Sequence, residues 1–353
     1  MKKFSAGYNY YFARYLSGFD VEGTTLTSGN RAFIFKGICE AKYWSFDDDE
    51  IPSTDVVLKA EIEAREYRSL CFIRLHDIDE MKYYISTYKL PVQISFKMFS
   101  NISMADKDGI VRHPSQNDVC NGIHSVLVCG YNSQPFRYED GSYDVGFFIF
   151  ENSWGYSWGD KGMGYLSYEY IKKYLYGATL MISPKQFFSN YVKDEVHNVA
   201  INDKCYTLWI GQSKGFTPSY LNIMIYSIRD IKGNVIGYLT SSKVTKSSVE
   251  VIDFFVWPDY CYNGIGELLL CEFIKYEKMY ETDLIFGWLT NNDCEKDSIF
   301  AVTSFFRKRG MKYISCNNCY PWASGIIYGN LNAIADFCHG SYYSINKVDF
   351  PVG

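Results

Sequence analysis

Two stretches of sequence decide the fold of the first half of the chain: GIHSVLVCGY at residues 122–131 and FIFENSWGYSWGDKGMGY at residues 148–165. The first places a single histidine, His124, at the head of an apolar strand. The second is a strand that ends at Asn152 and enters a turn rich in glycine and tryptophan. A histidine in a strand is more often a core residue than a catalyst. His124 becomes a candidate catalytic residue only because the second stretch follows it.

Together the two stretches resemble the carboxy-terminal half of papain-like cysteine peptidases, where a histidine strand precedes an Asn-Ser-Trp-Gly turn and a Trp-Gly-x-x-Gly-x-Gly-Tyr run. The resemblance implies that His124 is the general base and acid and that Asn152 orients its ring. Trp154 would shield this pair from water, and Trp158 is a second candidate for the same role. Such a site needs a thiolate beside an imidazolium and an amide that holds the ring in register.

The resemblance covers about residues 4–182, but the nucleophile is not among them. In the family it lies at the start of the first long helix, before the point where this chain begins. None of the four thiols in this region is preceded by Gln-Gly or followed by Trp; they are Cys39, Cys71, Cys120 and Cys129. We therefore expect this domain to be inactive as written. Three explanations stay open: a misplaced start, a nucleophile on a partner chain that also covers exposed apolar surface, or a relic that binds peptide without cutting it.

A third informative stretch is VEVIDFFVWPDYCYNGIGELLL at residues 249–270. It reads as a strand, a Gly-Ile-Gly turn and a helix, and such a turn exposes backbone N–H groups that can hold phosphate. The order resembles the acyl-CoA site of GNAT N-acyltransferases. Residues 284–292 and 305–311 resemble that family's fifth strand with its Asn-containing loop and its closing Phe-Tyr-x-x-x-Gly-Phe segment.

This second resemblance implies acetyl-CoA, or another acyl-CoA, as cofactor, and it assigns roles to residues of the stretch. The backbone of Phe255 and Val256 would pair with the pantetheine arm, and Asn292 would contact the cofactor. The pyrophosphate would be cradled by Cys261, Tyr262, Asn263, Gly264, Ile265 and Gly266. Two departures are that Cys261 replaces the usual Arg or Gln and that Phe306 replaces a Tyr that often serves as general acid.

The carboxylates of the strand are candidates for the base that deprotonates the amine. Glu250 or Asp253 could take this proton directly or through water. Strand alternation puts the two on opposite faces, so we expect only one of them to face the cleft.

Length and charge set the broad class of the protein. At roughly 150 residues per domain, 353 residues predict two domains, at 1–189 and 190–353, with the junction in a polar stretch. The 35 basic and 40 acidic residues give a net charge of −5, which argues against a nucleic-acid binder. An apolar run of membrane length and a signal peptide are both missing, and 11 scattered cysteines fit reduced thiols, so we expect a cytoplasmic protein without membrane contact. Cys316 and Cys319 have poor spacing for zinc, and we predict no metal site.

The fold class expected is α+β: a papain-like domain, incomplete at its amino-terminal part, followed by a GNAT-like mixed α/β domain. The leading hypothesis joins an inactive peptidase domain to an acetyl-CoA-dependent N-acyltransferase that acts on a peptide or small amine. The alternative is a cysteine peptidase whose nucleophile lies upstream of Met1 or on a partner chain, with the second domain as a binding module. A third reading makes both domains binding modules without activity.

Overall fold

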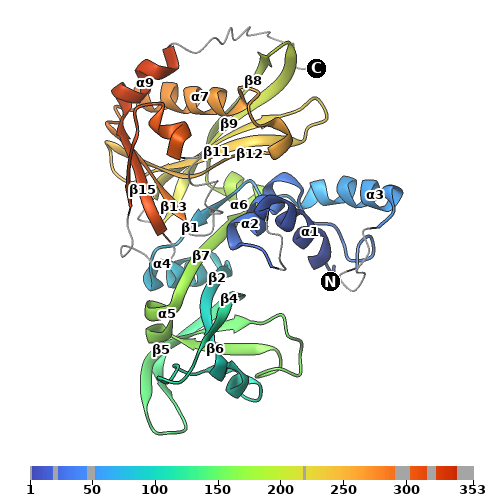
Figure 1. Ribbon diagram of the computed structural model, residues 1–353, viewed down its shortest axis with the longest axis vertical. Helices are drawn as coiled ribbons and strands as arrows, with labels where there is room; N and C mark the ends of the chain where they lie inside the picture. The colour runs from blue at the N-terminus through green and yellow to red at the C-terminus, as the bar shows by residue number, and fades with distance from the viewer. Residues whose placement is uncertain are drawn as a thin grey trace. The chain divides into compact units, whose positions relative to one another are not determined.

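The chain folds into two compact units (Figure 1). The computed structural model describes residues 2–18, 23–45, 52–217, 220–290, 303–315 and 323–339. The unit that we call the terminal unit contains residues 1–72, 182–317 and 323–353, and the central unit contains residues 73–181 and 318–322. These units do not follow the predicted division at 189/190, because residues up to 72 pack with the second half of the chain. As a boundary between sequence domains, that division stays a prediction.

The central unit is built on a sheet with the strand order β1-β7-β2-β4-β5-β6-β3. Strands β4 and β5 contain the strands predicted at His124 and before Asn152, and β2, β4, β5 and β6 pair antiparallel in this order. The elements, in chain order, are β1 (Cys71–Arg74), α4 (Ile78–Tyr83), the π-helix η2 (Tyr84–Tyr88), β2 (Val92–Phe99), η3 (Ser100–Ala105), β3 (Ile110–Val111), β4 (Cys120–Arg137), β5 (Tyr143–Glu151), β6 (Met163–Ser167), α5 (Tyr168–Tyr174) and β7 (Leu175–Ile182).

The terminal unit contains a second sheet, with the strand order β14-β15-β13-β12-β11-β10-β9-β8. The strand, turn and helix predicted within residues 249–270 are present as β12, the Gly264 turn and α7, and β13 covers the strand predicted from residue 284. Its elements after the central unit are α6 (Pro184–Ser189), β8 (Tyr191–Ile201), β9 (Lys204–Thr217), β10 (Tyr220–Arg229), β11 (Val235–Lys243), β12 (Ser248–Val256), η4 (Pro258–Tyr260), α7 (Ile265–Met279), β13 (Leu284–Thr290), β14 (Lys312–Ser315), β15 (Ala323–Asn330) and α9 (Leu331–His339).

Helices α7 and α9 cover one face of this second sheet (Figure 1). Leu269 and Phe273 of α7 are fully buried there, as is Leu239 of β11. The close approach of the helix requires a glycine at position 237, because a Cβ at this position would lie 2.9 Å from Cγ2 of Ile265. The apolar core therefore fixes the start of α7 over the middle of the sheet.

A fork opens between β12 and β13, the parallel pair of this sheet. Their pairing is limited to Ser248 with Leu284, Val249 with Ile285, and Glu250 with Phe286. Both strands continue, to Val256 and Thr290, without further pairing to each other, while β12 stays paired with β11 and β13 with β15. Glu250 therefore stands at the last paired position, the vertex of the fork.

A β-bulge in β12 changes the direction of its side chains. Thr240 of β11 pairs with Asp253, whereas Ser242 pairs with Glu250, and the register shifts in between. Directly paired residues share a face of the sheet, and Thr240 and Ser242 share a face of β11. Glu250 and Asp253 consequently lie on the same face. The prediction of opposite faces was wrong because the bulge inserts a residue and resets the alternation.

The opposite face of β11 and β12 is covered by the beginning of the chain, which forms α1 (Ala6–Ser17), α2 (Leu26–Phe35), α3 (Thr54–Ala64) and η1 (Arg65–Tyr67). Arg31 of α2 binds Asp253 through two contacts, Nη2 to Oδ1 at 2.7 Å and Nε to Oδ2 at 3.2 Å. Phe35 packs on the rings of Tyr238, Phe255 and Trp257 at centroid distances of 5.3–5.7 Å. The ion pair and the aromatic contacts together hold α2 on the sheet.

In the ranges that the structure describes, no helix has the length and apolar character needed to cross a bilayer.

Replacing Arg31 with methionine should lower the free energy of unfolding by about 3 kcal/mol, because the buried Asp253 loses its cation. The control is Lys275→Met, which breaks the more exposed pair with Glu272 on α7 and should cost about 0.5 kcal/mol or less. Urea denaturation of both variants and the unmodified chain measures the difference. Equal stability of the two variants would contradict a structural role for the Arg31 pair.

Candidate functional site

The central unit brings His124 and Asn152 into contact. His124 lies near the start of β4 and Asn152 directly follows β5, and the antiparallel register pairs Leu127 with Glu151. The hairpin therefore places the start of one strand beside the end of the other. Nε2 of His124 and Oδ1 of Asn152 are 2.9 Å apart.

The hydrogen bonds around Asn152 fix the tautomer of the histidine. The backbone N–H of Ser153 donates to the same Asn152 oxygen at 2.8 Å, so this atom must be the carbonyl oxygen and not the amide nitrogen. Because that oxygen can only accept, Nε2 of His124 must carry a hydrogen. In the neutral ring, Nδ1 then holds the lone pair. His124 is thus prepared to act as a base through Nδ1.

Two tryptophans enclose this pair. The Trp154 ring stacks on the His124 ring with a centroid distance of 4.6 Å, and Trp158 meets Trp154 edge to face at 5.3 Å. Trp158 is anchored by its Nε1–H, which donates to Asp106 at 3.0 Å. Burial lowers the pKa of His124 below its ordinary value, and the hydrogen bond with Asn152 opposes this shift. The ring is therefore neutral at pH 7.

The two described thiols of the central unit, Cys120 and Cys129, contact backbone carbonyl oxygens and not the His124 ring. Sγ of Cys120 contacts the carbonyl oxygen of Gly122 at 3.7 Å, and Sγ of Cys129 contacts that of Ile149 at 3.6 Å. Burial raises the pKa of Cys129, and it also raises the pKa of Cys39 in the terminal unit to about 11. Thiols of this kind are protonated at pH 7, so they lack the thiolate character of a nucleophile.

The terminal unit carries the predicted Gly-x-Gly turn at the open end of the fork. Gly264 is the N-cap of α7 with φ 86°, and no side chain among the described residues caps this end. The first amides of the helix, including those of Ile265 and Gly266, have no acceptor within the helix. The thiol of Cys261 points back to the carbonyl oxygens of Val256 and Trp257, at 3.7 and 3.8 Å. The turn therefore offers backbone donors without a competing side chain.

The surroundings of the turn are compatible with an anion. Glu267 lies in the first turn of α7, where its charge would repel a phosphate, but it forms an ion pair with Arg309. Tyr262 is fully exposed with φ 62°. The local field at the helix start is then set by the helix dipole and not by the carboxylate.

The carboxylates predicted as bases differ in their contacts. Asp253 is bound by Arg31, and the hydroxyl of Tyr238 also donates to it. Glu250 is 2% exposed and stands at the vertex of the fork. Phe255 and Val256 follow on the same strand beyond the vertex, while Asn292 lies outside the described residues.

The segment that closes the second resemblance returns to β12. The rings of Phe305 and Phe306 pack on Phe254 at 5.6 and 5.8 Å, and Phe306 is buried. Cys316 and Cys319, the pair weighed for zinc, lie outside the described residues.

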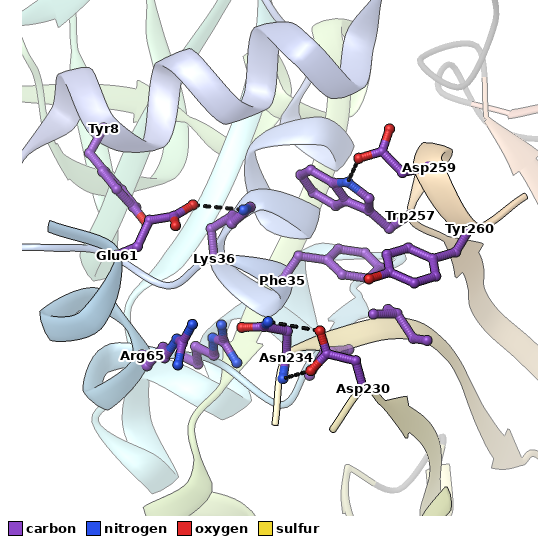
Figure 2. A pocket seen from close by; sticks show the side chains of 13 residues that line it. Tyr8, Phe35, Lys36, Glu61, Arg65, Asp230, Asn234, Trp257, Asp259 and Tyr260 are labelled. Carbon is purple, nitrogen blue, oxygen red and sulfur yellow. Dashed lines mark hydrogen bonds and ion pairs between the residues drawn. The ribbon is translucent and has the colours of Figure 1, made fainter. Parts of the chain in front are cut away.

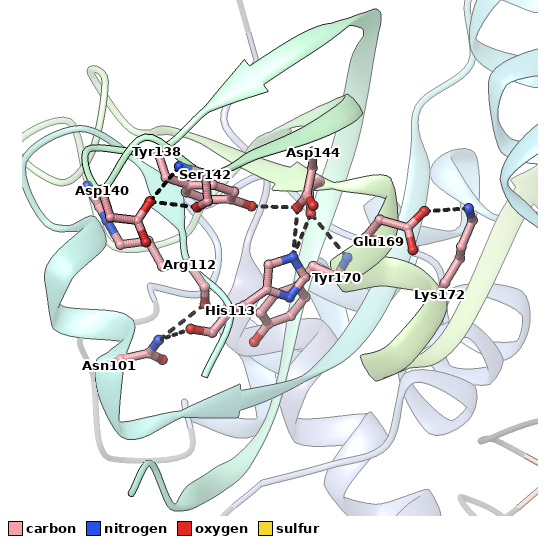
Figure 3. A network of polar contacts seen from close by, with 11 residues as sticks. Asn101, Arg112, His113, Tyr138, Asp140, Ser142, Asp144, Glu169, Tyr170 and Lys172 are labelled. Carbon is pink, nitrogen blue, oxygen red and sulfur yellow. Dashed lines mark hydrogen bonds and ion pairs between the residues drawn. The ribbon is translucent and has the colours of Figure 1, made fainter. Parts of the chain in front are cut away.

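A further polar network in the central unit had no signal in the sequence. Nε2 of His113 lies 2.7 Å from Oδ2 of Asp144, and the hydroxyl of Tyr138 donates to the same oxygen (Figure 3). Ser167 approaches the same ring nitrogen at 3.4 Å. A catalytic triad needs its acid and its nucleophile on different nitrogens of the histidine, so this network is not one.

Comparison with known proteins supports the peptidase resemblance. Residues 22–179 match the family described as papain family cysteine protease. An uncharacterized peptidase C1-like protein of Acanthamoeba polyphaga mimivirus is 25% identical over 158 residues, which make up 42% of this chain and 48% of that protein. The chain thus spans about half the length of this curated relative.

Solved structures of two kinds are similar to this chain. Xylellain, a cysteine protease from Xylella fastidiosa, has a TM-score of 0.42 and 19% identity, covering 51% of this chain and 70% of its own. An acetyltransferase of the GNAT family from Staphylococcus aureus has a TM-score of 0.27 and 17% identity, covering 31% of this chain and 68% of its own.

The predicted fold class is confirmed: the family match covers the papain-like part, and the sheet with its fork and Gly264 turn forms the mixed α/β part. Residues 22–179 are therefore similar to the papain family cysteine proteases.

Proposed function

We propose that the terminal unit is an acyl-CoA-dependent N-acyltransferase that acts on the amino group of a peptide or small amine. The observation that carries this proposal is the fork between β12 and β13, which closes at Glu250 and opens toward the turn at residues 261–266. A cleft between two strands that starts at a helix amino terminus suits a long ligand with a phosphate at one end.

The residues along β12 fit the parts of the cofactor in order. The amides of Gly264, Ile265 and Gly266 would hold the pyrophosphate. The pantetheine arm would pair with Phe255 and Val256 along the edge of β12 that no longer pairs with β13. The strand from Glu250 to Val256 spans about 20 Å, which leaves room for an extended arm between the turn and the vertex. The acyl-CoA supplies an activated acyl group there. This fit supports acetyl-CoA or another acyl-CoA as the ligand.

We assign the role of general base to Glu250 and a structural role to Asp253. An amine is mostly protonated at pH 7 and must lose a proton before it can attack an acyl group. Glu250 stands at the vertex, where the acyl end of the ligand would lie. Asp253 is held by Arg31 and Tyr238, so proton transfer to it would break the ion pair.

A second candidate function is cysteine-type peptide hydrolysis by the central unit. The observation that favours it is the tautomer of His124, whose lone pair on Nδ1 is in place to receive a proton from a thiol. The nucleophile would come from upstream of Met1 or from a partner chain. Without that thiol, the site would bind peptide and not cleave it.

Gly264→Glu should lower the affinity for CoA by about tenfold or more, equivalent to about 1.4 kcal/mol, because it adds negative charge at the phosphate-binding turn. The matched control is Gly141→Glu, which makes the same change at a glycine of nearly the same φ, 85°, in open space in the central unit. Isothermal titration calorimetry with CoA measures the affinity of both variants and of the unmodified chain. Absence of saturable CoA binding by the unmodified chain would refute the acyltransferase proposal.

Glu250→Gln should reduce acetyl transfer about 100-fold while CoA affinity stays unchanged, because only the proton acceptor is removed. The assay follows thiol release from acetyl-CoA in the presence of spermidine or a lysine-containing peptide. Glu195→Gln, at the exposed edge strand β8, is the control for loss of one carboxylate. Full turnover by Glu250→Gln would show that another group accepts the proton.

Trp154→Ala should raise the pKa of His124 toward 6.5, because it exposes the imidazole to water. A pKa below the unfolded value means that the contribution of His124 to stability is complete above pH 6.5 and is lost as the pH falls through the folded pKa. Trp154→Ala should therefore reduce the part of the unfolding free energy that the protein loses as the pH falls. NMR titration of the His124 ring measures the shift, with Tyr156→Ala, an exposed position in the same turn, as control. An unchanged pKa would mean that Trp154 does not shield the ring.

A further inference from the structure

A cavity of about 180 Å³ lies within the terminal unit, between the amino-terminal helices and the second sheet (Figure 2). Tyr8 and Lys36 line it from the helical side, and Trp257 and Tyr260 line it from the end of β12. Its volume corresponds to about six water molecules, enough for a small polar group.

Two polar groups at this cavity have no partner. Tyr8 is 0% exposed, and its hydroxyl makes no hydrogen bond with any described residue. Nε of Arg68 is likewise buried without an acceptor in the described part of the chain. Buried donors are satisfied in almost all native proteins. Two unsatisfied donors on residues that line one cavity are therefore candidates to bind an acceptor there.

Arg68 lies close to two further cations. Burial and the nearby Arg65 and Arg229 lower the pKa of Arg68 to about 10, and Tyr8 and Asp230 oppose this shift. Arg68 is still charged at neutral pH. Within the described ranges, no carboxylate forms an ion pair with any of these three guanidinium groups. Arg65 and Arg68 both line the cavity without an ion-pair partner among the described residues, so they can attract an anion.

The acidic side chains of the cavity are already engaged. Glu61 accepts from Lys36 at 2.8 Å. Asp230 accepts from the backbone and the side chain of Asn234, at 2.8 and 2.9 Å, as Figure 2 shows. Asp259 accepts from Trp257 at 3.3 Å, and Tyr15 also donates to it. The arginines are therefore the groups left to meet a ligand.

We propose that this cavity binds an anionic group, a phosphate or a carboxylate, through Arg68 and Arg65, with the Tyr8 hydroxyl as a further donor. The planar guanidinium presents paired N–H groups that match two oxygens of such an anion. An acceptor between Tyr8 and Arg68 would satisfy both buried donors at once.

Two ligands could bring the anion. Trp257, Asp259 and Tyr260 line the cavity and directly precede the turn at residues 261–266. A phosphate of the proposed acyl-CoA and an anionic group of the acceptor substrate share this chemistry. The anion site itself does not depend on the acyltransferase proposal.

The test is calorimetric titration of the full chain with inorganic phosphate, and with acetate as the carboxylate probe. Arg65→Gln should weaken binding about tenfold or more, since a charge-assisted contact is lost. Tyr8→Phe should weaken it by about threefold to tenfold. Lys59→Gln removes an exposed cation from α3, outside the cavity, and should leave the affinity unchanged.

Tyr8→Phe also separates binding from folding. The hydroxyl has no hydrogen-bond partner among the described residues, so the variant should keep the thermal stability of the unmodified chain in phosphate-free buffer. Added phosphate should stabilise the variant less than it stabilises the unmodified chain. Saturable binding that weakens in Tyr8→Phe and Arg65→Gln supports the site. No saturable binding of either anion at millimolar concentration, or equal affinity of all variants, overturns it.

Comparison of CoA with 3′-dephospho-CoA identifies the source of the anion. A preference for CoA that disappears in Arg65→Gln assigns the site to the cofactor. Simultaneous binding of phosphate and CoA assigns it to the acceptor. Phosphate binding without any CoA binding supports the anion site and contradicts only the acyltransferase proposal.

Discussion

The contact between Arg31 and Asp253 is the constraint on which the arrangement of the terminal unit depends. A carboxylate that is 5% exposed on the inner part of a sheet needs a cation, and the chain supplies it from a helix 222 residues away in sequence. The same helix brings Phe35 onto the ring cluster of β11 and β12. A helix from the segment that matches the peptidase family thus completes the core of the second sheet.

The bulge in β12 links this packing to the candidate chemistry. By turning Glu250 and Asp253 to one face, it presents two carboxylates to the side where α2 lies. One is neutralised by Arg31, which leaves the other at the vertex of the fork. Two charges that would repel each other are thereby given different environments, as the different roles proposed for Asp253 and Glu250 require.

Local sequence patterns predicted the parts that depend on local physics. The strands around His124 and Asn152, the strand at 249–256 and the helix at 264–280 follow from apolar periodicity and glycine turns. The edge strand β8 was missed because exposed edge strands are polar, and its residues read as a linker. The bulge and the partners of Asp253 could not be predicted, since neither one inserted residue nor a contact across 222 positions leaves a periodic signal. The unpaired Tyr8 and Arg68 are visible only once the helices are packed.

The packing of α2 has a consequence for how such a protein could arise and change. If the two halves were joined by gene fusion, contacts later formed across the fusion point. The first half now contributes a salt bridge and a ring cluster to the second. Recombination near residue 190 would separate the second sheet from the Arg31 salt bridge and the Phe35 ring contacts. Selection would then favour inheritance of the pair as one piece, even though each half resembles a family that is found alone.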